Sequence, residues 1–441
     1  MSLTPPATVE KLQAALHAKA KGSPGQRFHA LYDKVYRRDV LVYAYERCRQ
    51  NKGAPGVDGR TFEDIEKYGL GAWLDERTED LRKKTYQPRP VRRAWIPKPD
   101  GKKRPLGIPT IRDRVVQMAA VLVLEPIFEA DLQPEQHAYR RGRSALEAIG
   151  AVHSLVNTGH TEVAAADLSG YFDDIPHQEL MKSAARRVCD GAMLHLIKMW
   201  LVAPVEEVDV RGRRRRTTRN KDEGRGTPQG AVISPLLANL YMRRFVLGWK
   251  TLGHEQRLGA RIINYADDFV ICCRRTGEQA LAAMRRMIGR LKLTVNERKT
   301  RLCRLPEETF DFLGYTIGRC YSPRTGRAYL GTRPSSKKVQ KLLNIVSAGT
   351  SRNSLWREEG DLVGWLNRKL VGWANYFRLG PVTKAYERVN RHVCQRLRRW
   401  LCRKHGTAGG GYYRYSDRRI YADLGLIQLT WARFGLPRAN A

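Results

Sequence analysis

The sequence has few acidic residues for its length. Asp and Glu total 44 of the 441 residues, whereas Lys and Arg total 80, which leaves a formal net charge of +36 at pH 7. A surplus of this size attracts polyanions from solution, so nucleic acid is the expected partner. The positive charge is spread along the whole chain and does not form a basic amphipathic helix or a juxtamembrane cluster, which argues against a membrane surface.

Paired cysteines and long apolar segments are also missing. Eight cysteines are scattered, Cys272 and Cys273 are adjacent, and no Cys-x-x-Cys spacing occurs. This usage argues against a disulfide framework and against a structural zinc site. The longest apolar stretch, residues 115–124, is interrupted by Gln117 and is too short to span a bilayer. The first residues lack the basic-then-apolar pattern of a secretory signal, so we expect a cytoplasmic protein with no membrane partner.

Residues 91–108 predict a hairpin with a cationic tip. Two strand-like runs, 91–98 and 103–108, flank Asp100-Gly101, and glycine tolerates the positive φ that a tight primed turn requires. Four cationic side chains crowd the tip: Lys98, Lys102, Lys103 and Arg104. These charges either face water or grip a phosphate, and the hairpin alone does not decide between the two.

Carboxylates follow or separate several strand-like runs. Residues 163–167 predict a strand packed through small side chains that ends on Asp167, and Asp267 and Asp268 lie between the apolar runs 262–263 and 269–271. Burying a carboxylate without a partner is costly, so a cation is expected nearby. Magnesium is the leading candidate because it prefers carboxylate oxygens and often works beside phosphates. The alternative is a polar turn whose acids face water.

The order of the predicted elements indicates a mixed α+β domain followed by helices. The strand at 163–167, the hairpin around Asp267 and a helix with apolar residues across 281–291 favour a domain built on an antiparallel sheet. Residues 322–326 are predicted to be a linker. Beyond it, apolar residues recur at helical spacing across 339–346 and in two further helices near residues 362–373 and 386–401.

Acids that converge from separate strands are typical of the palm of a template-directed polymerase. Two metal ions about 3.5 to 4 Å apart can activate a primer 3′-hydroxyl and stabilise the departing pyrophosphate, and carboxylates must hold them. Because successive residues of a strand point to opposite faces, Asp267 and Asp268 are not expected to do equal work. We expect Asp267 to pair with Asp167 as the main ligand set and Asp268 to lie closer to the primer end.

Seven segments, taken in chain order, are similar to those of one known protein family. They are residues 53–59, 96–109, 141–144, 226–239 with Gly-Thr-Pro-Gln-Gly, 265–268 with Tyr-Ala-Asp-Asp, 297–300 and 312–314. Together they resemble a group II intron-encoded reverse transcriptase and maturase. Many relatives carry a C-terminal endonuclease with paired cysteines and histidines, a spacing that this sequence does not show.

The resemblance implies an α+β right-hand polymerase in a bacterial cytoplasm. Its fingers and palm combine an antiparallel sheet with helices, and its thumb or maturase domain is all helical. The implied divisions are an N-terminal extension and fingers over 1–160 and a palm with part of the fingers over 161–318. A helical thumb or maturase domain over 334–405 and a reduced DNA-binding-like tail over 406–441 would follow.

The resemblance also implies roles for single residues. The catalytic residues and Mg²⁺ ligands would be Asp167, Asp267 and Asp268. Lys98 and Arg104 would hold the incoming triphosphate, and Phe172 would be an aromatic gate that excludes a ribose 2′-hydroxyl. Gln229 would line the nucleotide pocket and Lys299 would meet the leaving pyrophosphate. Without the resemblance, Phe172 would be interpreted as ordinary core.

The maturase signature across 364–378 implies contact with structured RNA. Trp365, Trp373 and Phe377 are expected in the core. Candidate RNA-binding residues in this signature and in the helix after it are Arg368, Lys369, Arg378, Arg391 and Arg398. A second basic stretch at 211–216, continued by three further cations up to residue 225, is either an insertion loop on the RNA or a disordered charged loop.

The implied function is an RNA-directed DNA polymerase that copies intron RNA into cDNA by two-metal nucleotidyl transfer. As a maturase it would also bind that RNA and promote its splicing and mobility. The implied partners are structured intron RNA, an RNA template with a DNA or RNA primer, deoxynucleoside triphosphates and target DNA. Two alternatives remain open: a domesticated relative in DNA repair or phage defence, and a splicing-only RNA-binding maturase.

Overall fold

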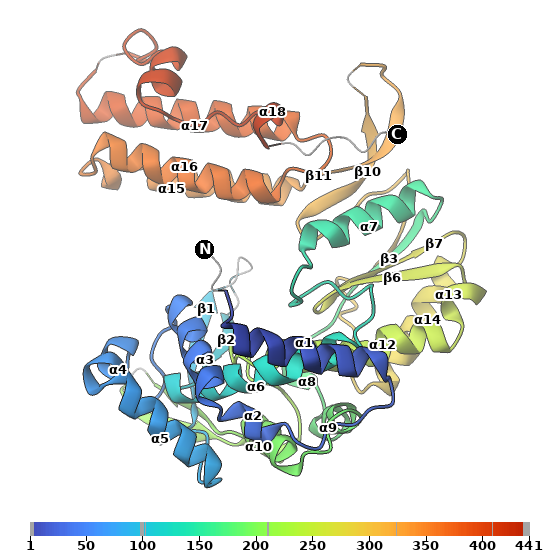
Figure 1. Cartoon of the computed structure of the whole chain (residues 1–441). Coiled ribbons are helices and arrows are strands. Elements are labelled where there is room, and N and C mark those ends of the chain that lie inside the picture. Colours follow the sequence, from blue (N-terminus) through green and yellow to red (C-terminus); the bar gives the residue numbers. More distant parts are fainter. Residues whose placement is uncertain are drawn as a thin grey trace.

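The N-terminal part of the chain is helical and surrounds one buried helix. The computed structural model describes residues 4–97, 101, 103–209, 211–322, 324–407 and 409–434. Helix α6 (Ile111–Glu129) is apolar on nearly every side and is therefore a core helix. The helices around it are α1 (Ala7–Gly22), α2 (Tyr32–Val35), α3 (Arg38–Gln50), α4 (Phe62–Tyr68) and α5 (Leu70–Arg82). Figure 1 shows them at the blue end of the chain.

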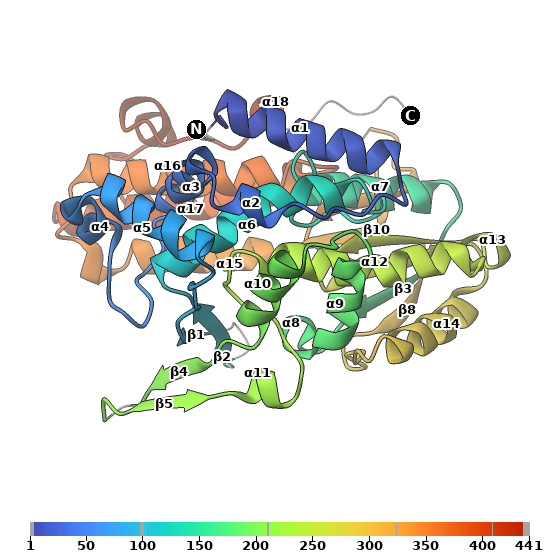
Figure 2. The same cartoon turned by 60° about the horizontal axis from the view of Figure 1, so that its bottom comes forward.

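A four-stranded sheet forms the fingers, in the order β2-β1-β4-β5. Strands β1 (Val91–Pro97) and β2 (Lys103–Ile108) pair antiparallel, which confirms the predicted hairpin. Lys98 and Lys102 at its tip lie outside the described residues. Strand β4 (Val205–Val208) runs parallel to β1, and β5 (Arg214–Thr217) pairs with β4 at the edge, where Figure 2 shows it projecting from the molecule.

The basic stretch at 211–216 enters β5 at Arg214, so of the two alternatives a disordered loop does not describe its second half. Arg216 donates through Nε to Glu206 Oε2 at 2.7 Å, and Arg214 lies 3.6 Å from the same carboxylate. Glu206 is buried, and these two arginines neutralise it. The alternation of a strand therefore fixes Arg214 and Arg216 on one face and leaves Arg215 on the other.

The palm sheet is antiparallel throughout, in the order β6-β7-β3-β8, as predicted. Its strands are β3 (Glu162–Asp167), β6 (Ala260–Tyr265), β7 (Asp268–Cys273) and β8 (Arg301–Arg304). One face packs on α12 (Ser234–Thr251) and α14 (Gly277–Arg290), the other on α7 (Ala145–Asn157). The shorter helices of this region are α8 (Tyr171–Asp174), α9 (His177–Ala185), α10 (Gly191–Leu201), α11 (Arg219–Asp222) and α13 (His254–Arg257).

A second antiparallel sheet, β11-β10-β9, leads from the palm to the helical domain. Its strands are β9 (Phe310–Phe312), β10 (Tyr315–Tyr321) and β11 (Ala328–Pro334). Tyr321 pairs with Ala328, so the described residues between them, 322 and 324–327, belong to the hairpin turn that joins β10 to β11. The predicted linker at 322–326 is therefore wrong, and the chain enters the helical domain after β11.

Three long helices form the C-terminal domain: α15 (Ser336–Gly349), α16 (Glu359–Tyr376) and α17 (Thr383–Lys404). A short helix at Arg352–Ser354 lies between α15 and α16, and two more, at Arg419–Asp423 and at α18 (Trp431–Phe434), follow α17. Tyr415, Ile420 and Leu426 are buried in the same core as the three helices. The packing is thus continuous past residue 405, where the sequence predicted a boundary.

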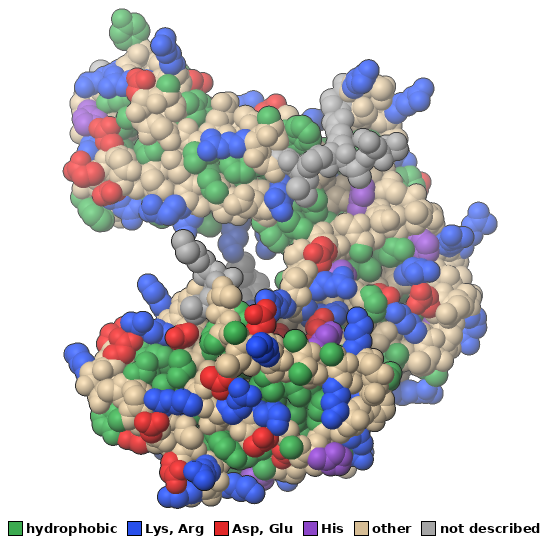
Figure 3. All heavy atoms as spheres, viewed as in Figure 1, with side chains coloured by type: hydrophobic (Ala, Val, Ile, Leu, Met, Phe, Trp, Pro, Cys, Tyr) green, Lys and Arg blue, Asp and Glu red, His purple; other side chains and the backbone are tan. Residues whose placement is uncertain are grey.

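The helical domain faces the fingers across an open cleft, visible in the space-filling view of Figure 3. The palm sheet and the strands β10 and β11 lie at the closed side of this cleft (Figure 1). Within the described ranges, every helix is too short or too polar to cross a membrane.

Candidate active site

Two neighbouring strands of the palm sheet bring the three predicted carboxylates together. Asp167 is the last residue of β3, and the ladder pairs it directly with Asp268, the first residue of β7. Asp267 lies in the two-residue connection between β6 and β7, where Ala266 has a φ of 58°. The buried amide of Asn264 donates to the Ala266 carbonyl at 2.8 Å and holds this turn. Convergence of the acids was expected from the sequence, but this register was not.

Burial, and after it the neighbouring negative charge, raises the pKa of Asp267 and of Asp268. Burial raises the pKa of Asp268 to about 7, and the neighbouring Asp267 and Asp167 contribute to the rise. Burial, with a contribution from Asp167, also raises the pKa of Asp267. Two like charges at one site disfavour ionisation, and a nearby cation reverses this effect. The cluster is therefore chemically suited to a divalent cation.

Lys299 supplies a cation to this cluster from the segment before β8. Its Nζ lies 2.8 Å from Asp167 Oδ2, and the same oxygen accepts a hydrogen bond from Asn296 Nδ2 at 3.0 Å. In the described part of the chain, no three Asp, Glu, His or Cys side chains are arranged as a complete metal site. The donor chemistry nevertheless fits Mg²⁺, which commonly takes one or two carboxylates and completes its shell with water and substrate phosphates.

The raised pKa of Asp268 predicts a pH-dependent stability in metal-free protein. The folded state holds the proton up to about pH 7, whereas the unfolded side chain releases it near its ordinary value of 3.8. The free energy of unfolding should therefore fall as the pH rises from about 4 to about 7. Urea unfolding in EDTA across this range measures the slope, and Asp268→Asn should flatten it. Equal slopes for the two proteins would contradict the assignment.

Phe172 lies at the edge of the core beside the Pro-Gln-Gly turn. It is half-buried, and its ring makes edge-to-face contacts with Tyr171 and Tyr139, with centroids 5.7 and 6.4 Å away. Its carbonyl accepts a hydrogen bond from the Thr227 amide at 2.7 Å. Phe172 therefore packs against core residues with one part and remains accessible with another, a position compatible with both interpretations of the sequence.

Gln229 is held between the palm and the fingers. Its Nε2 donates to Asp173 Oδ2 at 2.9 Å, and its carbonyl accepts from the Gly107 amide on β2 at 2.6 Å. A Cβ at Gly230, where φ is +108°, would lie 2.6 Å from the Gly107 carbonyl oxygen. Only glycine permits this approach, so the turn and strand β2 meet at the site. Arg104 is exposed on β2. Burial raises the pKa of Asp267, and the positive charge of Arg104 offsets part of this rise.

Sequence reasoning missed two residues of this site. Asn296 binds Asp167 twice, because its backbone amide also donates to the Asp167 carbonyl at 2.8 Å. Its position one residue before the 297–300 segment was the available signal. Tyr139 has a φ of 56°, uncommon for a residue other than glycine, and lies beside Phe172. Its pKa is raised by burial first and then by Asp267.

The five candidate RNA-binding residues differ in accessibility. Arg368, Lys369 and Arg391 are exposed on α16 and α17, and Arg378 is half-buried. Arg398 is only 3% exposed; it donates through Nε to the Tyr415 carbonyl at 2.8 Å and forms an ion pair with Asp417. The RNA-binding prediction for Arg398 is therefore wrong, because the tail covers this side chain. Of the predicted core positions, Phe377 is buried, whereas Trp365 and Trp373 are partly buried and pack against the core.

Comparisons with known proteins cover most of the chain. Residues 96–317 match the family model described as reverse transcriptase (RNA-dependent DNA polymerase), and residues 339–420 match the group II intron maturase-specific domain. Protein YkfC of Escherichia coli is 32% identical in a 370-position alignment that covers 75% of this chain and 93% of that protein.

Two further relatives match over a smaller part of their own length. The group II intron-encoded protein LtrA of Lactococcus lactis is 34% identical over 234 residues, 51% of this chain and 36% of LtrA. An uncharacterized 91 kDa protein in the cob intron of Schizosaccharomyces pombe is 30% identical over 212 residues, 48% of this chain and 25% of that protein. In both cases the matched region is about half of this chain.

Proposed function

Because the chain belongs to the reverse transcriptase (RNA-dependent DNA polymerase) family and carries a group II intron maturase domain, we propose that it copies intron RNA into cDNA. It also binds that RNA as a maturase and promotes its splicing and mobility. The observation that carries the polymerase role is the meeting of Asp167, Asp267 and Asp268 beside Lys299. The exposed cations of the helical domain support the RNA-binding role.

The three aspartates would hold Mg²⁺, with Asp267 and Asp167 as the main ligands and Asp268 nearer the primer end. Bound there, Mg²⁺ would activate the primer 3′-hydroxyl and stabilise the charge of the leaving pyrophosphate. Asn296 keeps the Asp167 carboxylate oriented. Lys299 forms an ion pair with Asp167 at 2.8 Å and would meet the pyrophosphate as it departs. Arg104 and Lys98 would hold the triphosphate.

Phe172→Ala should let the polymerase use ribonucleotides. The phenyl ring would collide with a 2′-hydroxyl, and forcing extra atoms into a packed site costs about 1 to 3 kcal/mol, so discrimination should fall about 10- to 100-fold. Single-nucleotide extension gives kcat/KM for a deoxynucleotide and for the matching ribonucleotide. Phe172→Tyr, which keeps the ring, should discriminate as wild type does. An unchanged ratio in Phe172→Ala would rule out the gate.

The proposal as a whole is tested by two assays on the purified protein. Primer extension on an RNA template with deoxynucleotides and Mg²⁺ tests the polymerase role, and splicing of a precursor RNA that contains the flanking intron tests the maturase role. Extension without any effect on splicing would favour the domesticated alternative. Support of splicing without extension would favour the splicing-only alternative.

A further inference from the structure

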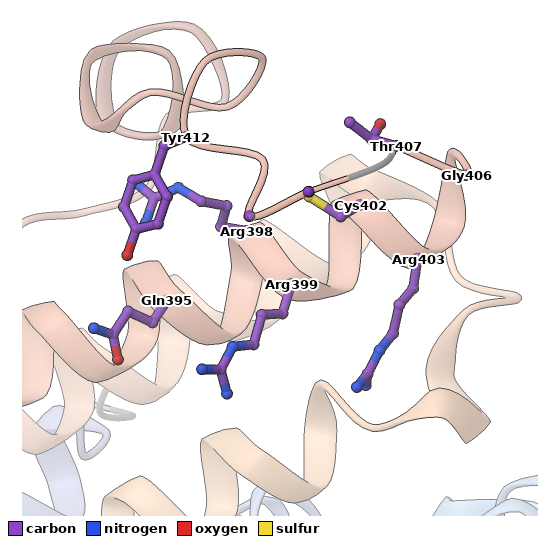
Figure 4. Close-up of a pocket in the computed structure, with 10 residues that line it drawn as sticks. Gln395, Arg398, Arg399, Cys402, Arg403, Gly406, Thr407 and Tyr412 are labelled. Atoms are coloured by element: carbon purple, nitrogen blue, oxygen red, sulfur yellow. The ribbon is translucent and has the colours of Figure 1, made fainter.

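A pocket opens at the C-terminal end of α17, far along the chain from the palm. It has a volume of about 460 Å³, within the range of about 300 to 1,000 Å³ in which small-molecule sites fall. Its walls come from the last turns of α17 and from the glycine-rich segment that follows. Figure 4 shows Gln395, Arg399 and Arg403 extending from one side of the helix and Tyr412 lying beside Arg398.

A close approach of the chain to α17 fixes the aromatic wall of this pocket. At Gly411, where φ is +68°, a Cβ would lie 2.1 Å from Cys402 Sγ, so only glycine fits here. The next residue, Tyr412, therefore lies over Arg398, whose guanidinium carbon is 4.0 Å from the ring centroid. Arg398 is itself buried and held by Asp417. The Tyr412 side chain remains accessible, with 62% of the residue exposed.

The pocket has a positive charge that nothing nearby neutralises. Arg399 and Arg403 are one helical turn apart and exposed, and among the described residues neither guanidinium group donates a hydrogen bond or forms an ion pair. None of the described residues that line the pocket is acidic. Burial lowers the pKa of Arg396, and the adjacent Arg403 and Arg399 lower it further. The ligand of such a pocket must be an anion.

We propose that this pocket binds an unpaired nucleotide of a nucleic acid strand, with its base stacked on Tyr412 and its phosphate on Arg399 and Arg403. Every base has a π face that can stack on an aromatic ring, and clustered arginines track the phosphate backbone. A duplex does not fit this description because its bases are already stacked. The inference deepens the proposed function, since it specifies how the C-terminal region would hold an RNA or DNA strand.

Photocrosslinking locates the strand independently of the other basic surfaces. Full-length protein is irradiated with a single-stranded RNA ten-mer that carries 5-iodouridine, and the crosslinked peptide is identified by mass spectrometry. We expect the adduct on Tyr412. A DNA ten-mer with 5-iododeoxyuridine shows whether the pocket accepts both strands or RNA alone. Adducts confined to other peptides in both experiments would overturn the proposal.

Binding of the same RNA ten-mer tests the energetic contribution. The variant Tyr412→Ala is expected to bind the RNA ten-mer about 10-fold more weakly than wild type, because one base stack is lost. Tyr413→Ala is the matched control, since Tyr413 is the next residue, is fully exposed and does not line the pocket. Tyr412→Phe keeps the ring and should bind as wild type does. Equal losses in Tyr412→Ala and Tyr413→Ala would contradict the proposal.

The contribution of the two arginines to binding is tested by the salt dependence of Kd. The double variant Arg399→Ala/Arg403→Ala should bind more weakly and with a shallower dependence of log Kd on log salt, because two phosphate contacts are lost. Primer extension on an RNA template is measured for all variants and should be unchanged. Failure of wild type to extend a primer would reject the polymerase role and leave the pocket to be judged by the crosslink and by Tyr412→Ala.

Discussion

Asp267→Asn should lower primer extension on an RNA template by about 1,000-fold, because a bound metal contributes several kcal/mol of charge stabilisation and about 1.4 kcal/mol is tenfold in rate. The amide keeps the shape of the side chain but removes a charged ligand oxygen. Asp267 lies in the β6–β7 connection beside Asp167 and Asp268, so no other acid of this cluster replaces it without moving the turn. The rate of single-nucleotide addition at saturating Mg²⁺ is the measurement.

Asp267→Asn also tests whether DNA synthesis and the promotion of splicing are separate activities. Splicing is catalysed by the RNA, and the protein would contribute phosphate neutralisation, so Asp267→Asn should support splicing as wild type does. Asp268→Asn should lose less extension than Asp267→Asn if the two acids have unequal roles. Loss of both activities in a folded Asp267→Asn protein that still binds RNA would refute the separation, and equal losses in the two variants would refute the unequal roles.

Arg187→Met should lower the free energy of unfolding by about 3 to 5 kcal/mol, the usual result of removing one partner of a buried ion pair. Arg187 is buried and forms a two-point contact with Asp131, at 2.8 and 3.0 Å. It also donates to the carbonyls of Ala20, Ser23 and Gln26, and so ties the end of α1 to the region after α9. Equilibrium urea unfolding followed by tryptophan fluorescence gives the value.

The neighbouring arginine provides a matched control for this effect. Arg186 also contacts Asp131, at 2.6 Å, but its side chain is 45% exposed. Exposed pairs contribute about 0 to 1 kcal/mol, so Arg186→Met should leave stability nearly unchanged. Trypsin should cleave after α1 faster in Arg187→Met alone. Similar stability of the two variants would show that burial does not decide the strength of these pairs.

Local sequence patterns were sufficient to predict the elements whose structure depends on residues close together in the chain. The β1–β2 hairpin followed from Asp100-Gly101, and the helices α15 to α17 followed from the spacing of their apolar residues. The two acidic segments were found because carboxylates between apolar strand residues are unusual. Their convergence was predicted from polymerase chemistry, since nothing local to either segment brings β3 beside β7.

The incorrect predictions concern residues whose structure depends on segments that are distant in the sequence. Residues 322–326 have the same turn-forming composition in a hairpin as in a linker, and only the pairing of β10 with β11 distinguishes them. Arg398 lies on α17 among other arginines, and its burial depends on a tail that contributes Asp417. Likewise, the arginines of β5 are ordered by Glu206, a residue on another strand that a charge count does not reveal.

The contact between Lys299 and Asp167 affects the charge of the active site before substrate arrives. An acid cluster left alone competes for protons with any ligand, and the raised pKa of Asp268 shows how strongly this one does. Lys299 lies 2.8 Å from Asp167 Oδ2 and supplies one positive charge to this cluster. An arriving triphosphate would offer Lys299 a second anion. If Lys299 moved to the triphosphate, Asp167 Oδ2 would become free to bind a metal ion, so substrate entry and the release of this oxygen would occur together. The resting site thus carries its own counterion, and loading the site with a metal ion would be a substitution of cations.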